Sequence, residues 1–347
     1  MTANGAAKYL HKEPVNHRVI LALMPCVLAA VYYFGWRSLA MVLWACVVGF
    51  IVEYLFTRQR NEPVSESIFV TAVIFALIMP PTVGWHVVGI GMAFAAALAK
   101  GVFGGFGRNI FNPAMAGRCF VYICFPVALT AVWAAPAQGP WGALDRWTTA
   151  AEPAAISGAT PMAYLKAGKL ELGGQEETIP FDIKEERTVQ VKKSVLLKGL
   201  LFGRISGTMG VTSALVICIG GLYLFITKTA NRSIVLSLIL TYAILNQVLF
   251  WFGVKPVPGA WPAILGGGFL FGAFFMATDP ISAPKTKEAR IFYGILIGVF
   301  TLVIRNFSIF NGGLMFSILI GNMFAPIMDY AVREYKKGKQ AKEAANA

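Results

Sequence analysis

Long apolar runs recur along most of this chain, between residues 19 and 331. Most of them approach eighteen residues, roughly the length that a helix needs to cross a hydrocarbon core about 30 Å thick. A water-soluble globule could not bury them all, because 57% of the residues are hydrophobic and only 14% are charged. The sequence therefore predicts an all-α polytopic membrane protein in the lipid bilayer, with about ten transmembrane helices.

The expected helices fall into two groups of five. In chain order they are Val19–Trp36, Leu39–Phe56, Ser67–Pro80, Val87–Phe103, Ala114–Val132, Val211–Thr227, Ser233–Gly253, Trp261–Thr278, Ala289–Asn306 and Gly312–Ala331. Most connections are short, but one long loop separates the fifth helix from the sixth. The predicted organisation is therefore a first half at 19–133, a loop at 134–208 and a second half at 209–331.

Lysine and arginine collect in every second connection, which indicates the orientation. Basic residues occur at 57–62, 100–109, 227–233 and 282–290 and in both tails, whereas the short connections between these are nearly free of charge. Basic short loops stay in the cytoplasm. Residues 1–18 and the basic tail 332–347 are therefore expected to be cytoplasmic, and the 134–208 loop extracytoplasmic. Residues 1–16 are polar, so the first apolar run is expected to be a retained span rather than a signal peptide.

The net charge of +13 does not predict nucleic-acid binding, because the basic residues mostly flank membrane spans. The five cysteines all lie in apolar stretches and form no CxxC pair, which is typical of buried small hydrophobic residues. The three histidines are too few and too scattered for a haem pair. No metal site is predicted.

Two similar stretches suggest an internal repeat. RNIFNPAMAG at 108–117 enters the fifth expected helix, and RNFSIFNGGLMFS at 305–317 enters the tenth. An offset of five helices places the two copies on opposite sides of the membrane, as a five-plus-five inverted repeat requires. Coincidence is the competing explanation for so short a similarity.

The glycine-rich turn before the fifth helix is a candidate ligand pocket. Gly104, Gly105 and Gly107 permit close backbone approach, and Asn109 and Asn112 can both donate and accept hydrogen bonds. Irregular backbone at membrane depth is tolerated where it lines a cavity or is buried in protein. A tight re-entrant turn without a ligand is the alternative.

A few charged residues lie at the ends of expected helices and are candidates for an ion path. Asp279 precedes a proline at the end of the eighth helix, and Glu53, Lys100 and Asp329 lie near the cytoplasmic ends of theirs. Charged groups near the bilayer are costly and commonly functional. The alternatives are a helix stop for Asp279 and snorkelling to the membrane surface for the others.

The long loop contains the tetrapeptide Ser157-Gly158-Ala159-Thr160, followed by Pro161. Small residues beside a proline are typical of an ordinary polar turn. The same stretch also offers an exposed hydroxyl on an accessible segment, which a modifying enzyme could reach.

Several stretches, taken in order, resemble one family: the membrane subunits shared by the Rnf complex, where the subunit is designated D, and the sodium-pumping NADH:quinone oxidoreductase, where it is designated B. They are MPPT (79–82), FGGFGRNIFNPAMAGR (103–118), SGATP (157–161), GTMGVTSAL (207–215), FFMATDPISAP (274–284) and the run at 305–322. The resemblance covers nearly the whole chain from Val19 to Tyr330. The shortness of the chain favours the Rnf branch.

This resemblance implies two flavin cofactors. In the family the threonine of the SGAT-type motif, here Thr160 after Ser157, Gly158 and Ala159, carries FMN through a phosphodiester bond that a flavin transferase installs. A second, noncovalent flavin, riboflavin, is implied at the asparagine-rich turn, at Asn109 and Asn112. The chain departs from the family at Ala154, where an acidic residue is usual, and at Val211, where glutamate is frequent.

The leading hypothesis is therefore a flavin-carrying subunit of an ion-translocating complex in a bacterial inner membrane. It would pass electrons through the membrane while the complex, as a ferredoxin:NAD oxidoreductase, moves Na⁺ or H⁺. The implied partners are the other membrane and peripheral subunits, including a second covalent-flavin subunit and iron–sulfur subunits. The alternatives are a subunit of the Na⁺-translocating NADH:quinone oxidoreductase, and a stand-alone channel or secondary transporter for a small polar solute.

Overall fold

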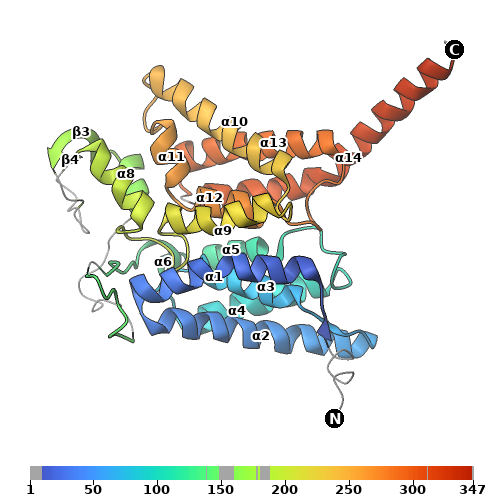
Figure 1. The fold of residues 1–347 in the computed structure, drawn as a ribbon, viewed down its shortest axis with the longest axis horizontal. Helices are drawn as coiled ribbons and strands as arrows, with labels where there is room; N and C mark the ends of the chain where they lie inside the picture. The colour runs from blue at the N-terminus through green and yellow to red at the C-terminus, as the bar shows by residue number, and fades with distance from the viewer. Residues whose placement is uncertain are drawn as a thin grey trace.

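The computed structural model describes residues 10–137, 139–147, 160–176, 179, 188–310 and 312–345. Most of the helices lie side by side in one bundle (Figure 1). The N-terminal segment and the C-terminal helix lie toward one end of the bundle, and the strands and helix of the long loop lie at the other end. These are called the terminal side and the loop side below. The predicted flavin-motif residues Ser157, Gly158 and Ala159, and Ala154, lie outside the described residues.

The first half contains two long helices and several short ones. Its elements are α1 (Pro14–Phe34), α2 (Trp36–Arg60), α3 (Ser67–Leu77), α4 (Trp85–Ala96), the π-helical turn η2 (Ala97–Gly101), α5 (Pro113–Cys124) and α6 (Pro126–Thr130). Gly35 joins α1 to α2 with φ +87°, where a Cβ would lie 2.7 Å from the Arg146 carbonyl oxygen. Pro126 divides the fifth expected helix into α5 and α6 because proline cannot continue the backbone ladder.

The second half repeats this mixture of long and short helices. It consists of α9 (Ala214–Ile226), α10 (Arg232–Trp251), α11 (Ala260–Leu265), α12 (Phe269–Phe271), the π-helical turn η3 (Gly272–Met276), α13 (Lys287–Phe307) and α14 (Gly313–Ala345). Ser213 and Asn231 cap α9 and α10 with their side-chain oxygens. The prediction of one continuous eighth helix at Trp261–Thr278 was wrong. Gly267 and Gly268 have φ +56° and +71°, and the chain breaks there.

Two short parallel strand pairs correct the all-α prediction. β1 (Leu10–His11) pairs with β2 (Val64–Ser65) on the terminal side. On the loop side, β3 (Leu170–Glu176) pairs with β4 (Val189–Val191) between the helices α7 (Pro161–Lys166) and α8 (Lys193–Phe202). This loop unit has a small core of its own, which includes Tyr164, Leu170, Val191 and Leu196.

The outer surface of the bundle is apolar, as lipid contact requires. Among the described residues, five helices are long and apolar enough to cross a membrane, namely α1, α2, α10, α13 and α14, and α3, α4 with η2, and α9 are shorter apolar helices. Large side chains such as Leu28, Ile226 and Trp251 are exposed by 64%, 64% and 75%. Such exposure is typical of a multi-pass membrane protein rather than of a soluble one.

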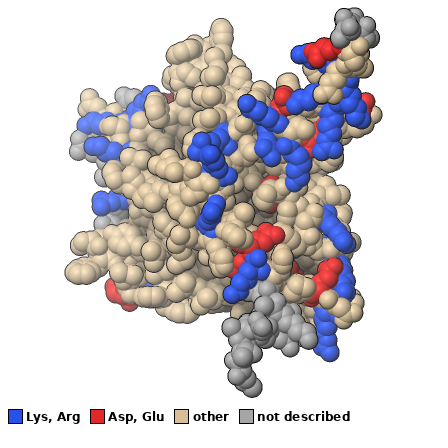
Figure 2. Space-filling model, turned by 45° about the vertical axis from the view of Figure 1, so that its right-hand side comes forward, with Lys and Arg blue, Asp and Glu red and all other residues tan. Residues whose placement is uncertain are grey.

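The interior is closed by aromatic and small residues from both halves. Tyr242, Tyr293, Phe75 and Phe269 are among its largest fully buried side chains. In the first half α2 packs on α4 and α4 on α5, and in the second half α10 packs on α13 and α13 on α14. The packing order is thus alike in the two halves, while the number of ten spans and the inverted repeat stay predictions. Figure 2 turns the terminal side forward, and Lys and Arg side chains gather there.

Candidate functional site

Two cavities lie toward opposite ends of the bundle. The first, of about 150 Å³, is lined on the loop side by Thr160 and Arg305 and extends inward to Arg118; it is called the loop-side cavity. The second, of about 90 Å³, is lined by residues that include Lys100, Asn109, Asn112 and Asp279; it is called the terminal-side cavity. The polar residues that the sequence predicted as functional therefore separate into two sites.

Thr160 lies on the wall of the loop-side cavity at the start of α7. It is the N-cap of this helix, and its Oγ1 accepts a hydrogen bond of 3.4 Å from the Ala163 amide. The sequence dictates this conformation because a threonine followed by proline is a strong helix start. The cap uses one lone pair of Oγ1, so the hydroxyl keeps its proton and a second lone pair for other chemistry.

Arg305, near the loop-side end of α13, is another polar group of this cavity. Its Nη1 donates to the Tyr242 hydroxyl at 3.2 Å and to the Ala263 carbonyl at 3.4 Å. Lys166 of α7 donates through Nζ to the carbonyls of Ser308 and Phe310. Burial and then the neighbouring Arg305 lower the pKa of the Lys166 ammonium. The cations at this end are thus bonded to neutral oxygens.

Arg118 reaches the same cavity from the middle of α5. Its Nε is buried and has no hydrogen-bond partner among the described residues. Arginine inside an apolar helix is costly and therefore a signal that sequence reasoning can use. The signal was present at both Arg118 and Arg305, and the sequence-based prediction missed both residues.

The terminal-side cavity is lined by both Asn109 and Asn112, the two residues of the predicted pocket, and ligand binding there stays a prediction. Asn112 is the N-cap of α5: its Oδ1 accepts from the Met115 amide at 3.3 Å, and its Nδ2 donates to the Met276 carbonyl at 3.2 Å. Asn109 makes one local bond, from Nδ2 to the Phe111 carbonyl at 3.0 Å. Asn112 therefore has a structural task in addition to any ligand contact.

Asp279 lies in the turn after η3 and lines the same cavity. Its Oδ2 accepts hydrogen bonds from the Ser282 amide at 3.2 Å and from the Ser282 hydroxyl at 2.6 Å. This is the local bonding expected of an aspartate that stops a helix before a proline. The structure therefore places Asp279 in a turn and at a cavity at the same time.

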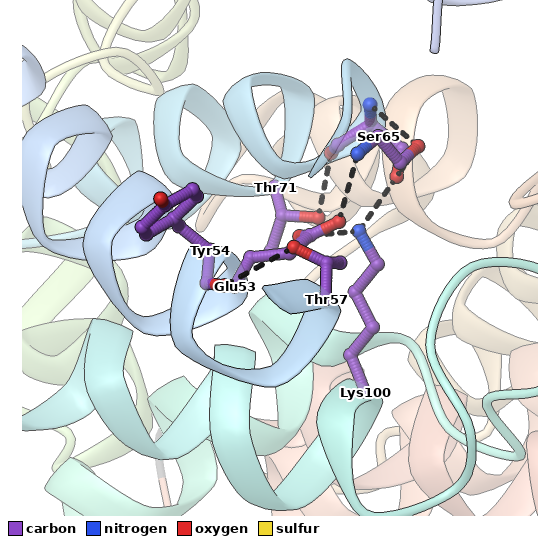
Figure 3. Close-up of polar contacts among 7 residues, drawn as sticks. Glu53, Tyr54, Thr57, Ser65, Thr71 and Lys100 are labelled. Atoms are coloured by element: carbon purple, nitrogen blue, oxygen red, sulfur yellow. Dashed lines mark hydrogen bonds and ion pairs between the residues drawn. The ribbon is translucent and has the colours of Figure 1, made fainter. Parts of the chain in front are cut away.

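Glu53 and Lys100 form a buried ion pair beside this cavity (Figure 3). The Lys100 Nζ lies 2.7 Å from Glu53 Oε2 and donates to the Ser67 hydroxyl at 2.8 Å, while Glu53 Oε1 accepts from the Ser65 amide at 3.1 Å. The two residues are exposed by only 6% and 2%. Snorkelling is therefore the wrong interpretation for both. Lys100 belongs to η2, and it lines the cavity together with Ser67.

Asp329 does not snorkel either and lies outside both cavity walls. Its carboxylate accepts from the amides of Lys285 and Thr286, at 2.7 and 2.8 Å, and from the Thr286 hydroxyl at 2.8 Å. These bonds satisfy amides at the start of α13. Asp329 thus ties α14 to the two residues just before α13, including its N-cap Thr286, which is a structural task.

The two cavities approach one another at the start of α5 and at η3. Met115 lines the loop-side cavity, and the preceding residue, Ala114, lines the terminal-side cavity. The same holds for Met276 and Phe275. Neighbouring residues of α5 and η3 therefore form a thin common wall between a site near one end of the bundle and a site near the other.

Comparison with known proteins gives a consistent result. The chain matches the model of the NQR2, RnfD, RnfE family over residues 9–338. It is 34% identical to the subunit designated D of the ion-translocating oxidoreductase complex of Shewanella amazonensis, over 92% of each chain, and 34% identical to that of Alcanivorax borkumensis, over 90% of this chain and 89% of the relative. It is also 35% identical to the subunit designated B of the Na⁺-translocating NADH-quinone reductase of Ectopseudomonas mendocina, over 82% of this chain and 64% of that protein.

Proposed function

The chain belongs to the NQR2, RnfD, RnfE family, and from this premise we propose that it is a flavin-carrying membrane subunit of an ion-translocating oxidoreductase complex. The Rnf type is favoured over the quinone reductase because the match to the Shewanella amazonensis relative covers 92% of this chain, whereas the match to the Ectopseudomonas mendocina relative covers 82% of it. The complex would reside in a bacterial inner membrane, with the terminal side of this subunit in the cytoplasm. The enzyme is the whole assembly, a translocase of which this chain is one part.

We place covalent FMN at Thr160. The residues present suit the group: Thr160 offers a hydroxyl at the wall of a cavity, in a loop unit outside the helix bundle. A separate flavin transferase would form the phosphodiester bond to Thr160 Oγ1 from an activated flavin nucleotide: the phosphoanhydride bond of the donor would break, its nucleotide would leave, and the hydroxyl would lose its proton. When bound, the flavin supplies one- and two-electron redox chemistry, and the protein supplies its position and electrostatic surroundings.

A noncovalent riboflavin is placed in the terminal-side cavity. Asn109 and Asn112 line that cavity with amide groups that can match the donors and acceptors of a flavin ring. Asp279 and the Glu53–Lys100 pair line or border the same cavity, which makes them the proposed ion path. Electron carrier and ion path would then share one site on the terminal side.

The observation that carries this proposal is the common wall between the two cavities. A subunit that moves electrons across a membrane needs cofactor sites near both faces with little protein between them. Here Met115 and Met276 line one cavity and their chain neighbours line the other. Electrons would enter or leave through the partner subunits, which include iron–sulfur subunits and a second covalent-flavin subunit.

The deciding experiment is flavin fluorescence on a denaturing gel. Protein purified from its native complex should give a fluorescent band, and Thr160→Ala should abolish that band because it removes the attachment oxygen. Thr208→Ala is the matched control, since Thr208 is another threonine on the wall of the same cavity. Fluorescence that persists in Thr160→Ala would move the attachment site. A dark wild-type band from an assembled, active complex would contradict the proposal that this chain carries covalent flavin.

A further inference from the structure

The loop-side cavity gathers positive charge without a matching negative charge. Arg118 and Arg305 line it, and Lys166 lies close to Arg305. Among the described residues, no ion pair involves any of these three cations. Their recorded partners are hydroxyl and carbonyl oxygens, and Arg118 Nε has none within the described part of the chain.

A buried arginine cannot shed its charge, because its guanidinium stays protonated in proteins. In a medium of low polarity an unpaired charge is strongly unfavourable, so buried charges are normally paired. Lysine or arginine near the membrane surface can avoid this cost by reaching into water. Arg118 is in the middle of α5, and its buried Nε shows that this nitrogen has not taken that route.

Arg305 is held in place by close backbone packing. A Cβ at Gly267 would overlap the Arg305 guanidinium, and a Cβ at Gly313 would come within 2.9 Å of the Arg305 side chain. Both glycines also line the cavity. Glycine at 267 thus leaves room for the guanidinium at the cavity wall, and glycine at 313 allows the chain to pass close to the Arg305 backbone and Cβ.

We propose that Arg118 and Arg305 make the loop-side cavity a site for an anionic ligand, the phosphate ester of a flavin, and give it a preference for FMN over uncharged riboflavin. This inference rests on the proposed function, since it takes flavin as the occupant. Charge-assisted hydrogen bonds from guanidinium to phosphate are short and strong. They would supply the charge balance that the described residues of the cavity lack.

The test uses full-length Thr160→Ala/Asn109→Leu protein, which cannot hold flavin covalently and whose terminal-side riboflavin site is weakened, and titrates it with FMN and with riboflavin while flavin fluorescence is followed. FMN should bind about ten- to a hundredfold more tightly than riboflavin, because charged hydrogen bonds contribute that much. Adding Arg305→Gln or Arg118→Gln should reduce this ratio toward one. Arg204→Gln is the control, because Arg204 is an exposed loop-side cation outside the cavity wall.

Any one of three results would overturn the inference. They are equal affinities for FMN and riboflavin, absence of saturable FMN binding, and an unchanged ratio of the two affinities in both cavity variants. A further titration adds phosphatidylglycerol: displacement of FMN by this lipid would assign the site to a headgroup phosphate instead of a flavin. The proposed function fails separately, through a dark wild-type band on the gel. If the wild-type band is dark but the protein still binds FMN more tightly than riboflavin, the anion site exists and the flavin is not attached covalently.

Discussion

The two cavities differ in how their charges are balanced. On the terminal side, Lys100 is neutralised by Glu53, and Asp279 is bonded to Ser282. On the loop side, Arg118 and Arg305 have no carboxylate partner among the described residues. On the terminal side the cation that lines the cavity has a carboxylate partner before any ligand enters, whereas the two arginines of the loop-side cavity have none among the described residues. This difference supports our proposal of an uncharged flavin on the terminal side and a phosphorylated flavin on the loop side.

The largest effect expected is all-or-none and concerns which side of the membrane each cavity faces. In a cysteine-free background, Asp145→Cys on the loop side should react with an impermeant thiol reagent added to cells whose outer membrane has been permeabilised. Lys339→Cys in the C-terminal part of α14 should react only after the inner membrane is opened. Both residues are exposed, so access to the reagent depends on the compartment. The reverse pattern would exchange the two sides and place Thr160 in the cytoplasm.

Breaking the buried ion pair should have the next largest effect. Lys100→Met leaves Glu53 buried without its partner, which should cost roughly 3–5 kcal/mol of stability. The double variant Glu53→Gln/Lys100→Met should recover much of this loss. Lys336→Met, which breaks the exposed Lys336–Glu288 pair, is the control and should cost at most about 1 kcal/mol. Thermal unfolding in detergent measures all three.

Thermal unfolding of a loop-side variant makes the comparison between the two cavities sharper. In Thr160→Ala protein, which has no covalent flavin, Arg118→Met should be neutral or stabilising, because it removes a charged group whose buried Nε has no described partner to lose. A loss as large as that in Lys100→Met would mean that Arg118 is already paired. The contrast between the two cavities would then disappear.

The apolar runs predict the long helices well and the broken ones poorly. The expected helix at Ser233–Gly253 matches α10 to within a few residues, because a long apolar run has one dominant solution in a membrane. The expected helix at Trp261–Thr278 is divided, since Gly266 to Gly268 leave the backbone free to turn where tertiary packing demands it. The β3–β4 pair depends on contacts between distant residues, which local patterns do not reveal.

The sequence predicted individual residues of the candidate site but not their arrangement in two cavities. Asn109 and Asp279 could each be named from the sequence, yet nothing in their local patterns indicates that they line one cavity. The partners Glu53 and Lys100 are 47 residues apart, and their pairing follows from the packing of α2 against η2. Arg118 and Arg305 could have been found, because charged residues within apolar runs are costly enough to need a reason.

A moderate effect is expected from the two asparagines of the terminal-side cavity, and it tests whether this cavity holds an uncharged flavin. Asn109→Leu removes hydrogen-bonding capacity at similar size and should weaken riboflavin retention about five- to a hundredfold, at roughly 1–3 kcal/mol for each lost bond. Asn112→Leu should do the same and also lower stability by about 1 kcal/mol, because Asn112 caps α5.

Riboflavin extracted per mole of protein, measured beside the thermal midpoint, separates these contributions. Asn109→Leu should change retention with little change in the midpoint, since its one recorded bond is local. Stoichiometric riboflavin in the double variant would place the noncovalent flavin elsewhere. If Asn112→Leu loses riboflavin and has a lowered midpoint while Asn109→Leu keeps its riboflavin, the role of Asn112 is purely structural.

The smallest effect is expected at Asp279, where structural and ion-path interpretations meet. Asp279→Asn keeps an oxygen that can accept from the Ser282 amide and hydroxyl, so the turn should survive with stability changed by less than about 1 kcal/mol. What the variant loses is a carboxyl group on the wall of the cavity that Lys100 also lines. Ion uptake into vesicles that contain the assembled complex should therefore fall, with its half-saturating ion concentration raised, while the thermal midpoint stays near that of the wild type. Asp279→Ala removes the acceptor as well and should lower both. If Asp279→Asn leaves uptake, electron transfer and their dependence on ion concentration unchanged, the carboxylate only stops the helix, and the charge balance of the terminal side belongs to the Glu53–Lys100 pair alone.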